Sequence, residues 1–491
     1  MDRLMARVRS LFAAIDPVKL GVVASTLVAL GSFGGGAIRQ SGGVLEFLGL
    51  EFLKFGHGAG ISNVTLWLGT LLFVLAWIAL GVQIQRYALD QMRRVLLWWV
   101  VPLVFAAPIM SRDIYSYLMQ GTLLRDGFDA YTQGPAVNPG PLLTEVSQDW
   151  RNTTTPYGPL HLWLGEAITS VTGDNITAGV VIFKVLSVGG FALIAWSVAA
   201  IAKHLGMDPV WALWLGVANP VMVFHLVGGM HNESMMVGLV MLGLYWALRG
   251  RFYPAVAVIA VAMALKVTAA FSLPFVVWIA VRRHKQRTFG WFMAYALSGA
   301  ALTIAMLALI TYASGASWGW IAALTGNSKV INPLAFPSLF AGLVSQVGSL
   351  FVEPFPYNSV LQVTRTVSMG LMALGCVAAW WWGRNSQVQA LRGTAVAYLV
   401  AFFFNAVTLP WYYASILPLL GLIAPSKRVQ QIAIILSVAI GMAFTGSGNH
   451  QLYQPFWMTI WALLGFVAAM CITVKQEKRE VLLSDQQNIH A

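Results

Sequence analysis

Charged side chains are scarce in this sequence, because Asp, Glu, Lys and Arg make up only 10% of its 491 residues while 58% are hydrophobic. A water-soluble protein of this length needs a charged exterior, so the composition excludes a soluble globular enzyme. Cysteine is also scarce: only Cys376 and Cys471 occur, far apart and within apolar segments. This pair argues against a structural disulfide and against a thiolate metal site.

The alternation of polar and apolar residues that is typical of outer-membrane β-barrel strands is missing as well. Instead, apolar runs of roughly 17 to 25 residues recur, the length with which helices cross a hydrocarbon core of about 30 Å. The predicted fold class is therefore an all-α polytopic membrane protein. The net charge of +12 does not indicate nucleic-acid binding, because Lys and Arg cluster at the ends of the apolar runs, where they set membrane topology.

The basic clusters predict how the chain crosses the membrane. If every cluster is cytoplasmic, neighbouring clusters must be joined by an even number of crossings. About twelve full passes meet this condition and leave both termini in the cytoplasm. The first of these passes follows a basic N-terminal segment, as the apolar part of a signal peptide does, but it lacks a convincing signal-peptide cleavage site. We therefore interpret it as an uncleaved transmembrane helix. The passes are expected at residues 19–38, 63–84, 95–110, 176–202, 209–226, 232–249, 289–313, 360–383, 391–409, 411–424, 430–446 and 453–474.

Three further apolar segments do not fit as simple passes. The run at 252–281 would be about 45 Å long as one helix, which is too long for one pass and short for two, so we predict a membrane hairpin that turns near Lys266. The segments at 159–171 and 333–351 would break the charge parity if they crossed fully. We expect them to be interfacial or re-entrant helices on the outer side.

This topology predicts one transmembrane domain, residues 1–474, and a short cytoplasmic tail, residues 475–491. One large outer loop, residues 111–175, contains seven of the chain's 18 carboxylates. They are Asp113, Asp126, Asp129, Glu145, Asp149, Glu166 and Asp174. Acidic side chains therefore gather on the predicted outer side.

Asp113 follows directly after an apolar run, in the stretch SRDIYSYLMQ. A helix beginning here would place Asp113, Tyr117 and Gln120 on one stripe. Helix capping by Ser111 and Asp113 would explain this placement equally well. The alternative is catalytic, because a carboxylate at an outer membrane mouth can take a proton from a sugar hydroxyl. When the leaving group is already a phosphate, one base and a cation for that phosphate suffice.

Cations that could hold a leaving phosphate are present in the apolar segments. Lys266 lies at the predicted hairpin turn, where an unpaired charge would cost on the order of 3 kcal/mol, so a partner is expected. An internal ion pair is the alternative to a substrate contact. Arg365 lies just inside the outer end of its span, where it either binds phosphate or reaches to the interface. Lys184 is a weaker candidate of the same kind.

A second polar cluster, GGMHNESMM, places His231, Asn232 and Glu233 at the outer start of a pass. Asn232 and Glu233 would suit a helix start, and Glu233 is also our second candidate for carboxylate chemistry. One His and one Glu do not suffice for a metal site, so we expect no metal ligands. A divalent cation remains an option without support from the residues.

Two aromatic loops complete the candidate residues. TTTPYGPLHLW contains Tyr157 and would suit either a sugar-binding platform or a tight turn. TLPWYYASILP places Trp411 and Tyr412 at an outer turn, where an aromatic belt at the membrane surface is the alternative to a substrate contact.

In this order, the motifs SRDIYSYLMQG, GFDAYTQGP, TPYGPL, GGMHNESMMVGL and LPWYY resemble those of the polyprenyl-phosphomannose-dependent alpha-1,6-mannosyltransferases of actinobacteria. These enzymes belong to the GT-C superfamily. The resemblance spans roughly residues 111–413, and its one clear departure is Ala130, which stands where the family has proline.

The resemblance implies a GT-C fold in the bacterial plasma membrane, with the active site on the outer side. It implies transfer of mannose, with inversion, from a polyprenyl phosphomannose donor to the 6-hydroxyl of a lipid-anchored mannan acceptor, in lipomannan and lipoarabinomannan synthesis, with no required cofactor. It gives Asp113 the role of general base, with Arg112 holding the phosphate or orienting the carboxylate. The predicted substrate-binding residues are Arg112, Tyr117, Tyr157, His231, Asn232, Glu233, Lys266, Arg365, Trp411 and Tyr412.

Two other functions stay open from the residues alone. A transporter or flippase of lipid-linked sugars also uses intramembrane charges and broken helices. A GT-C enzyme with a different polyprenyl-linked donor is the second alternative.

Overall fold

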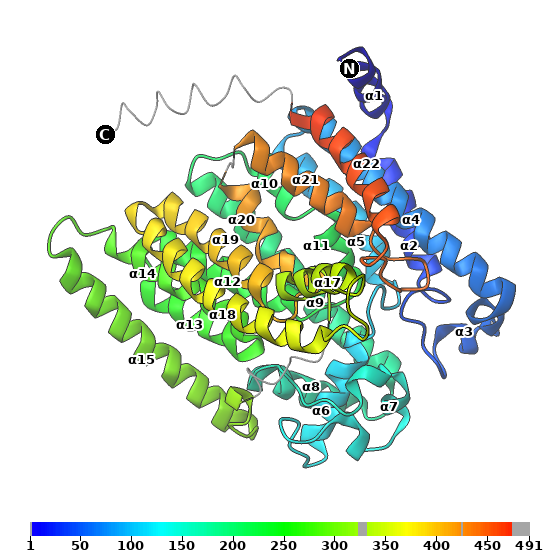
Figure 1. Cartoon of the computed structure of the whole chain (residues 1–491), viewed down its shortest axis with the longest axis horizontal. Helices are drawn as coiled ribbons and strands as arrows, with labels where there is room; N and C mark the ends of the chain where they lie inside the picture. The colour runs from blue at the N-terminus through cyan, green and yellow to red at the C-terminus, as the bar shows by residue number, and fades with distance from the viewer. Residues whose placement is uncertain (1, 323–330, 424–425, 474–491) are drawn as a thin grey trace.

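Helices make up the regular structure of this protein. The computed structural model describes residues 2–322, 331–423 and 426–473, and the predicted tail at 475–491 lies outside these ranges. Within them, the only extended pairing is an isolated bridge between Phe444 and His450. The predicted all-α class is therefore confirmed (Figure 1).

Six described helices are long and apolar enough to cross a membrane, or eight if each of two bent pairs forms one span. The six are α4 (Gly56–Gln83), α9 (Ile176–His204), α15 (Thr288–Ser314), α18 (Tyr357–Trp382), α19 (Gln387–Phe404) and α22 (Pro455–Thr473). The bent pairs are α1 (Asp2–Ala14) with α2 (Pro17–Gly31), and α10 (Pro209–Gly216) with α11 (Pro220–Met222) and η5 (Val223–Gly228). The chain is thus a multi-pass membrane protein, but twelve full passes are not confirmed.

Several expected passes are shorter or interrupted. The helices α5 (Leu89–Val104), α12 (Glu233–Leu248) and α21 (Lys427–Gly441) have 15 or 16 residues, so each is about 24 Å long and shorter than a typical hydrocarbon core. The pass expected at 411–424 is not one helix. It is divided into η8 (Pro410–Ser415) and α20 (Leu417–Leu422), because Pro418 has no N–H with which to continue the ladder from η8.

The chain turns at Lys266, where the sequence predicts the turn of a hairpin, while the position of this hairpin in the membrane stays a prediction. The helix α13 (Phe252–Leu265) ends at Lys266, whose backbone is extended, and the chain continues as η6 (Val267–Ser272) and α14 (Leu273–Val281). The two ends of the hairpin meet, since the guanidinium of Arg283 donates to the carbonyl of Leu248. Lys266 therefore lies at the tip, where the carbonyl of Leu265 accepts a hydrogen bond from the backbone N–H of Gly158, just before α8 (Pro159–Thr172).

A separate layer of short helices covers one end of the long ones. It contains α6 (Asp113–Arg125), α7 (Pro141–Glu145) and α8 (Pro159–Thr172). Two further short helices are α3 (Val44–Phe47) and α17 (Phe336–Gly348), of which α17 packs on α18. Neither α8 nor α17 is long enough to span a membrane. In Figure 1 this layer lies at the bottom, while α1 and the C-terminal end of α22 lie at the top.

Close packing of α6 on α8 fixes this layer. A Cβ atom added to Gly121 would lie 2.1 Å from the carbonyl carbon of Gly165, so the two backbones touch without side chains between them.

A second close contact joins α4 to α10. Trp77 of α4 and Trp214 of α10 exchange two hydrogen bonds of 3.0 Å, each indole N–H donating to the other residue's carbonyl. Their stacked rings lock the bent pair that contains α10 onto α4.

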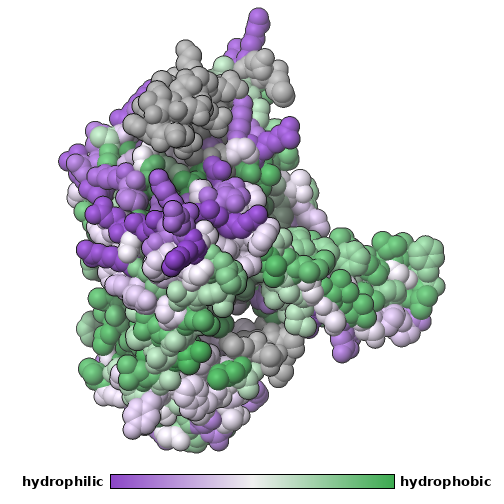
Figure 2. All heavy atoms as spheres, turned by 90° about the vertical axis from the view of Figure 1, so that its left-hand side faces the viewer, coloured by the Kyte–Doolittle hydropathy of each residue, from purple (hydrophilic) through white to green (hydrophobic). Residues whose placement is uncertain are grey.

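The surface separates into apolar and polar regions. Large apolar side chains are exposed along α15 and α18, among them Leu297, Ile304, Val363 and Leu374. Exposed apolar faces of this extent suit contact with lipid chains rather than water. Figure 2 shows hydrophilic side chains gathered in the upper part of the molecule and hydrophobic ones on the sides below.

Candidate active site

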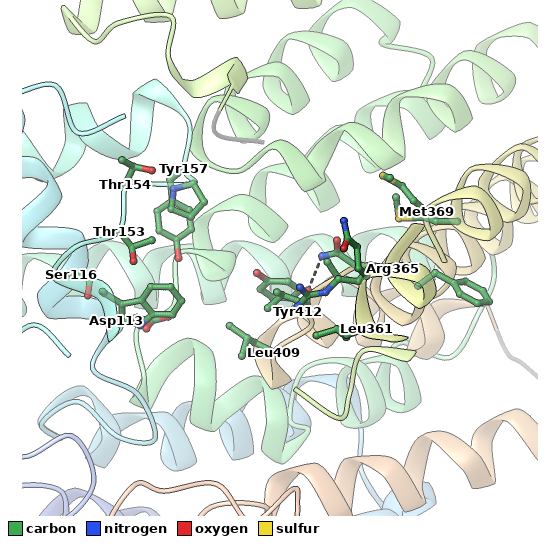
Figure 3. A pocket seen from close by; sticks show the side chains of 18 of the residues that line it. Asp113, Ser116, Thr153, Thr154, Tyr157, Leu361, Arg365, Met369, Leu409 and Tyr412 are labelled. Atoms are coloured by element: carbon green, nitrogen blue, oxygen red, sulfur yellow. Dashed lines mark hydrogen bonds between the residues drawn. The ribbon is translucent and has the colours of Figure 1, made fainter. Parts of the chain in front are cut away.

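A cavity of about 800 Å³ lies between the α6–α8 layer and α18. Its lining residues come from segments far apart in sequence. They include Asp113, Ser116, Tyr117 and Gln120 of α6, Trp150, Thr153, Thr154 and Tyr157 before α8, Asn358, Gln362 and Arg365 of α18, and Asn405, Leu409 and Tyr412 around η8. Figure 3 shows Asp113, Ser116 and Thr153 on one side of this cavity and Leu361, Arg365 and Met369 on the other. Its volume lies within the range of sites that enclose small organic ligands.

Among the residues that the structure describes, Asp113 is the one carboxylate that lines this cavity. Its side chain is 15% exposed, and one carboxylate oxygen lies 3.4 Å from Nδ1 of His231 and 3.5 Å from the hydroxyl of Tyr117. The backbone N–H of Asp113 donates to the hydroxyl of Ser111. The carboxylate is thus held in place on one side and remains open to the cavity on the other.

The backbone is strained where the two motifs of this site meet. Met110 and Met230 adopt positive φ angles of 62° and 55°. Residues other than glycine rarely adopt this backbone conformation, and those that do are frequent at functional sites. Each precedes a motif of the site, SRD and HNE, so the strained turns aim Asp113 and His231 toward each other.

Asp113 keeps its charge at neutral pH. Burial by itself raises the pKa of this carboxyl, but the hydrogen bond and charge of His231, the hydrogen bond with Ser111 and the charge of Lys266 lower it. The lowering contributions exceed the burial effect, so the pKa of Asp113 lies below its ordinary value. An ionised carboxylate that faces a cavity can accept a proton from a hydroxyl bound there.

Lys266 has a partner of opposite charge, as expected for a cation within an apolar segment. Its ammonium forms a buried ion pair with Glu233, and both side chains are almost fully removed from solvent. The ammonium also lies 4.2 Å from the ring centre of Tyr412 and 5.5 Å from that of Tyr157. Because both tyrosines line the cavity, the positive charge acts on it from directly behind its wall.

Aromatic rings form a compact wall behind Asp113. The ring of Tyr117 meets those of Tyr157 and His161 edge to face, with centroid distances of 5.3 and 4.8 Å. Burial and the charge of Lys266 lower the pKa of His161 to about 3, so this ring is neutral. Its Nδ1 lies 3.4 Å from the side-chain amide of Asn232. Asn232 is therefore part of the wall's hydrogen bonding and does not line the cavity.

Trp411 packs against one face of the His231 ring. The two rings are stacked, with centroids 3.7 Å apart and planes inclined by 16°. Neither residue lines the cavity, and the imidazole of His231 is fully buried. His231 contacts Asp113 and Trp411 holds His231 in place, whereas the sequence predicted direct contact of both residues with substrate.

The two candidate arginines differ in position. Arg112 donates to the carboxylate of Glu145 at 2.8 Å, to the carbonyl of Glu145 at 2.9 Å and to the carbonyl of Ile38. Glu145 is fully buried and also accepts from the backbone N–H groups of Gln40 and Ser41. Arg112 therefore fixes the loop around α7, and the expectation that it holds the donor phosphate does not fit this geometry. Arg365, in contrast, lines the cavity.

Sequence reasoning missed several residues that line the cavity. On α18, Asn358 lies four residues before Gln362, and Gln362 lies three residues before Arg365, so the three share one helix face. A polar stripe on an otherwise apolar span was the signal that could have identified them. Thr153 and Thr154 belong to the TTTPYGPLHLW loop that the sequence already offered as a sugar-binding platform, although neither was singled out. Trp150 lies in the short helix η4 (Gln148–Trp150), and its place at the cavity became apparent only from the fold.

In the described ranges there is no group of three or more His, Cys, Asp and Glu side chains that could hold a metal ion. The charged groups at this cavity and behind its walls are Asp113, Arg365 and the pair of Lys266 and Glu233. This arrangement can deprotonate a hydroxyl at one wall and attract an anion at the other.

The chain is similar to a defined set of membrane enzymes. Residues 18–282 match the family model described as "Alpha-(1->6)-mannopyranosyltransferase, N-terminal domain", and residues 337–474 match "MptB C-terminal domain". The chain is 54% identical to alpha-(1->6)-mannopyranosyltransferase A of Corynebacterium glutamicum, over 91% of this chain and 96% of that protein. It is 35% identical to alpha-(1->6)-mannopyranosyltransferase A of Mycobacterium tuberculosis, over 91% of this chain and 87% of that protein.

Proposed function

Because this chain belongs to the alpha-(1->6)-mannopyranosyltransferase family and is a membrane mannosyltransferase, we propose that it takes mannose from polyprenyl phosphomannose and adds it to a lipid-anchored mannan. The acceptor group is the 6-hydroxyl of the terminal mannose, and the enzyme acts in lipomannan and lipoarabinomannan synthesis. Family membership favours this reaction over transport or flipping of a lipid-linked sugar. The fold proposed for the chain is that of the GT-C superfamily.

The observation that carries the mechanism is the ionised carboxylate of Asp113, which opens on a cavity that Arg365 also lines. The acceptor oxygen attacks C1 of the donor mannose, and its proton passes to a carboxylate oxygen of Asp113. The bond between C1 and the phosphate oxygen breaks, and its electron pair leaves with the polyprenyl phosphate. Inversion at C1 gives an α-linked product from a β-linked donor.

The leaving phosphate needs positive charge but no proton, because it is already a good leaving group. Among the described residues, Arg365 is the cation that lines the cavity, and its planar guanidinium suits two phosphate oxygens. Lys266 adds positive potential through the rings of Tyr157 and Tyr412, although Glu233 balances part of it. We assign Thr153, Thr154 and Gln120 to hydrogen bonds with sugar hydroxyls, since all three line the cavity.

The proposed site lies on the outer face of the bacterial plasma membrane, with both termini in the cytoplasm. Two features favour this orientation. Seven carboxylates gather in the segment that contains α6, α7 and α8, while basic clusters mark the opposite ends of the spans. In Figure 1 the α6–α8 layer lies at the far end of the molecule from α1 and the end of α22.

The test uses the purified chain in detergent, where no membrane gradient exists. Polyprenyl phosphomannose, polyprenyl phosphoglucose and a nucleotide-linked mannose are offered with an alpha-1,6-linked mannose oligosaccharide, and the product linkage is determined by NMR. The proposal expects a new alpha-1,6 linkage with the first donor alone. Transfer from the nucleotide-linked sugar, or preference for the glucose donor, would show that the donor assignment is wrong.

A further inference from the structure

A second pocket lies apart from the candidate active site and has a different character. Its volume is about 290 Å³, and it is bounded by the loop between α2 and α4, the end of α5 and the first turns of α9. It shares no lining residue with the cavity that contains Asp113. Most of its wall is apolar, with Val44, Leu45 and Val104 on one side and Val180 and Val181 on the other.

This pocket opens toward the lipid-facing surface. Three of its apolar lining residues are strongly exposed: Phe105 by 73%, Val185 by 63% and Val181 by 56%. Val181 and Val185 lie on α9, which is long and apolar enough to span a membrane. In a bilayer, a hydrocarbon chain can therefore enter the pocket sideways from the surrounding lipid.

Three cations line the pocket, namely Arg39, Lys54 and Lys184, and no Asp or Glu is among the residues of its wall. The ammonium of Lys184 is buried and donates only to backbone carbonyls, those of Leu103 at 3.2 Å, Val227 at 2.9 Å and Gly228 at 3.4 Å. Its hydrogen-bonding capacity is used, but no carboxylate contacts it in the described chain. Lys184 thus places a buried amine, held by backbone carbonyls, behind an apolar wall.

Arg39 and Lys54 have donors that remain unused. One N–H of Arg39 donates to Thr177, while its Nε is buried and has no hydrogen-bond partner among the described residues. Nζ of Lys54 is also buried without a hydrogen bond, although a carboxylate oxygen of Glu51 lies 3.4 Å away. Buried donors without acceptors are costly, and a ligand oxygen would satisfy them.

We propose that this pocket binds an anionic phospholipid of the surrounding membrane. The phosphate oxygens accept hydrogen bonds from Arg39 and Lys54, and the first part of an acyl chain lies against Val181 and Phe105. Glu51 pairs with Lys54, whereas Arg39 forms no ion pair with a carboxylate among the described residues, so the guanidinium favours a lipid with a net negative charge over a zwitterionic one. The site is independent of the proposed mannose transfer, because the two pockets lie on opposite sides of α6.

The test is a lipid titration of the delipidated protein in detergent, followed by native mass spectrometry. Phosphatidylglycerol and phosphatidylcholine are the two probes. The variant Arg39→Gln/Lys54→Gln removes two cations of the pocket, and Lys285→Gln/Arg428→Gln removes two exposed cations elsewhere. The first variant should bind phosphatidylglycerol at least about tenfold more weakly, because each cation near an anionic headgroup contributes substantially to binding. The matched variant should bind it like the parent.

A second variant, Val181→Trp, narrows the apolar part of the pocket without changing any charge. Because Val181 is exposed, the larger side chain should not disturb the fold. It should also weaken phosphatidylglycerol binding. Unchanged binding in both pocket variants, or equal parent affinity for the two lipids, would overturn the proposal. If polyprenyl phosphate displaces phosphatidylglycerol and phosphatidylglycerol inhibits mannose transfer competitively, the pocket holds the donor lipid and the proposal is also wrong.

Discussion

The substitution Asp113→Asn tests the proposed general base directly. Asparagine has nearly the same shape as aspartate, so the side chain can keep its place beside His231 and Tyr117. It cannot accept a proton from an acceptor hydroxyl at neutral pH. The substitution therefore removes the proposed chemistry while it preserves the packing of α6.

The size of the effect follows from the surroundings of Asp113. General-base catalysis contributes about 10²- to 10⁴-fold to a rate. In the described part of the chain no other Asp or Glu lines the cavity, and Glu233 is held by Lys266 behind the wall, so no second carboxylate there replaces the lost one. We expect kcat to fall by about 10³-fold or more, equivalent to roughly 4 kcal/mol of transition-state stabilisation. The KM for the donor should change little, because the phosphate contacts remain.

The assay measures mannose transfer from polyprenyl phosphomannose by the purified protein, with size-exclusion chromatography as the check of folding. Asp126→Asn is the matched control, since Asp126 lies at the other end of α6 in a surface ion pair with Arg125 and does not line the cavity. It should keep the parent kcat. If Asp113→Asn is folded and turns over at a rate close to the parent's, Asp113 is not the base.

Three further predictions follow from the same geometry. In His231→Phe, the Trp411 stack can persist but the hydrogen bond and charge that lower the pKa of Asp113 are lost, so the acid limb of the profile of kcat/KM against pH should move to higher pH. The sign follows because the parent carboxylate, with its pKa below the ordinary value, stays ionised further into acid. Arg365→Gln should raise the donor KM about tenfold or more and change thermal stability little. Lys266→Met should destabilise the fold by about 3 to 5 kcal/mol in denaturant unfolding, and Lys266→Met/Glu233→Gln should recover most of that loss.

Each of these predictions has a control within the chain. His225→Phe removes a buried imidazole whose nitrogens have no hydrogen-bond partner among the described residues, and it should leave the acid limb in place. Arg112→Gln leaves the buried carboxylate of Glu145 without its cation, so it should lower the unfolding midpoint more than it changes the donor KM. An unmoved acid limb in His231→Phe, an unchanged KM in Arg365→Gln, or additive losses in the double variant would contradict the respective assignments.

The order of motifs predicted much of the site because each motif ends or begins an apolar segment. Asp113, Tyr117, Tyr157, Arg365 and Tyr412 were all proposed from such positions, and all five line one cavity. Arg112 shows the limit of this reasoning. Its place beside Asp113 in the chain suggested a shared role, but the two side chains diverge at the start of α6, and only the fold reveals Glu145 as the partner of Arg112.

Composition and charge placement by themselves determined that this is an all-helical multi-pass membrane protein and that its chain turns back at Lys266. The physical reason is that a lipid bilayer restricts both the length of each apolar segment and the position of every charged side chain. Only the tertiary structure decided which passes are interrupted, that Glu233 pairs with Lys266, and that the polar stripe of α18 faces α6 across a cavity. The ion pair joins residues 33 positions apart, and Asp113 and Arg365 face the same cavity from positions 252 residues apart (365 minus 113). No local pattern encodes them, since they depend on how the helices pack against one another.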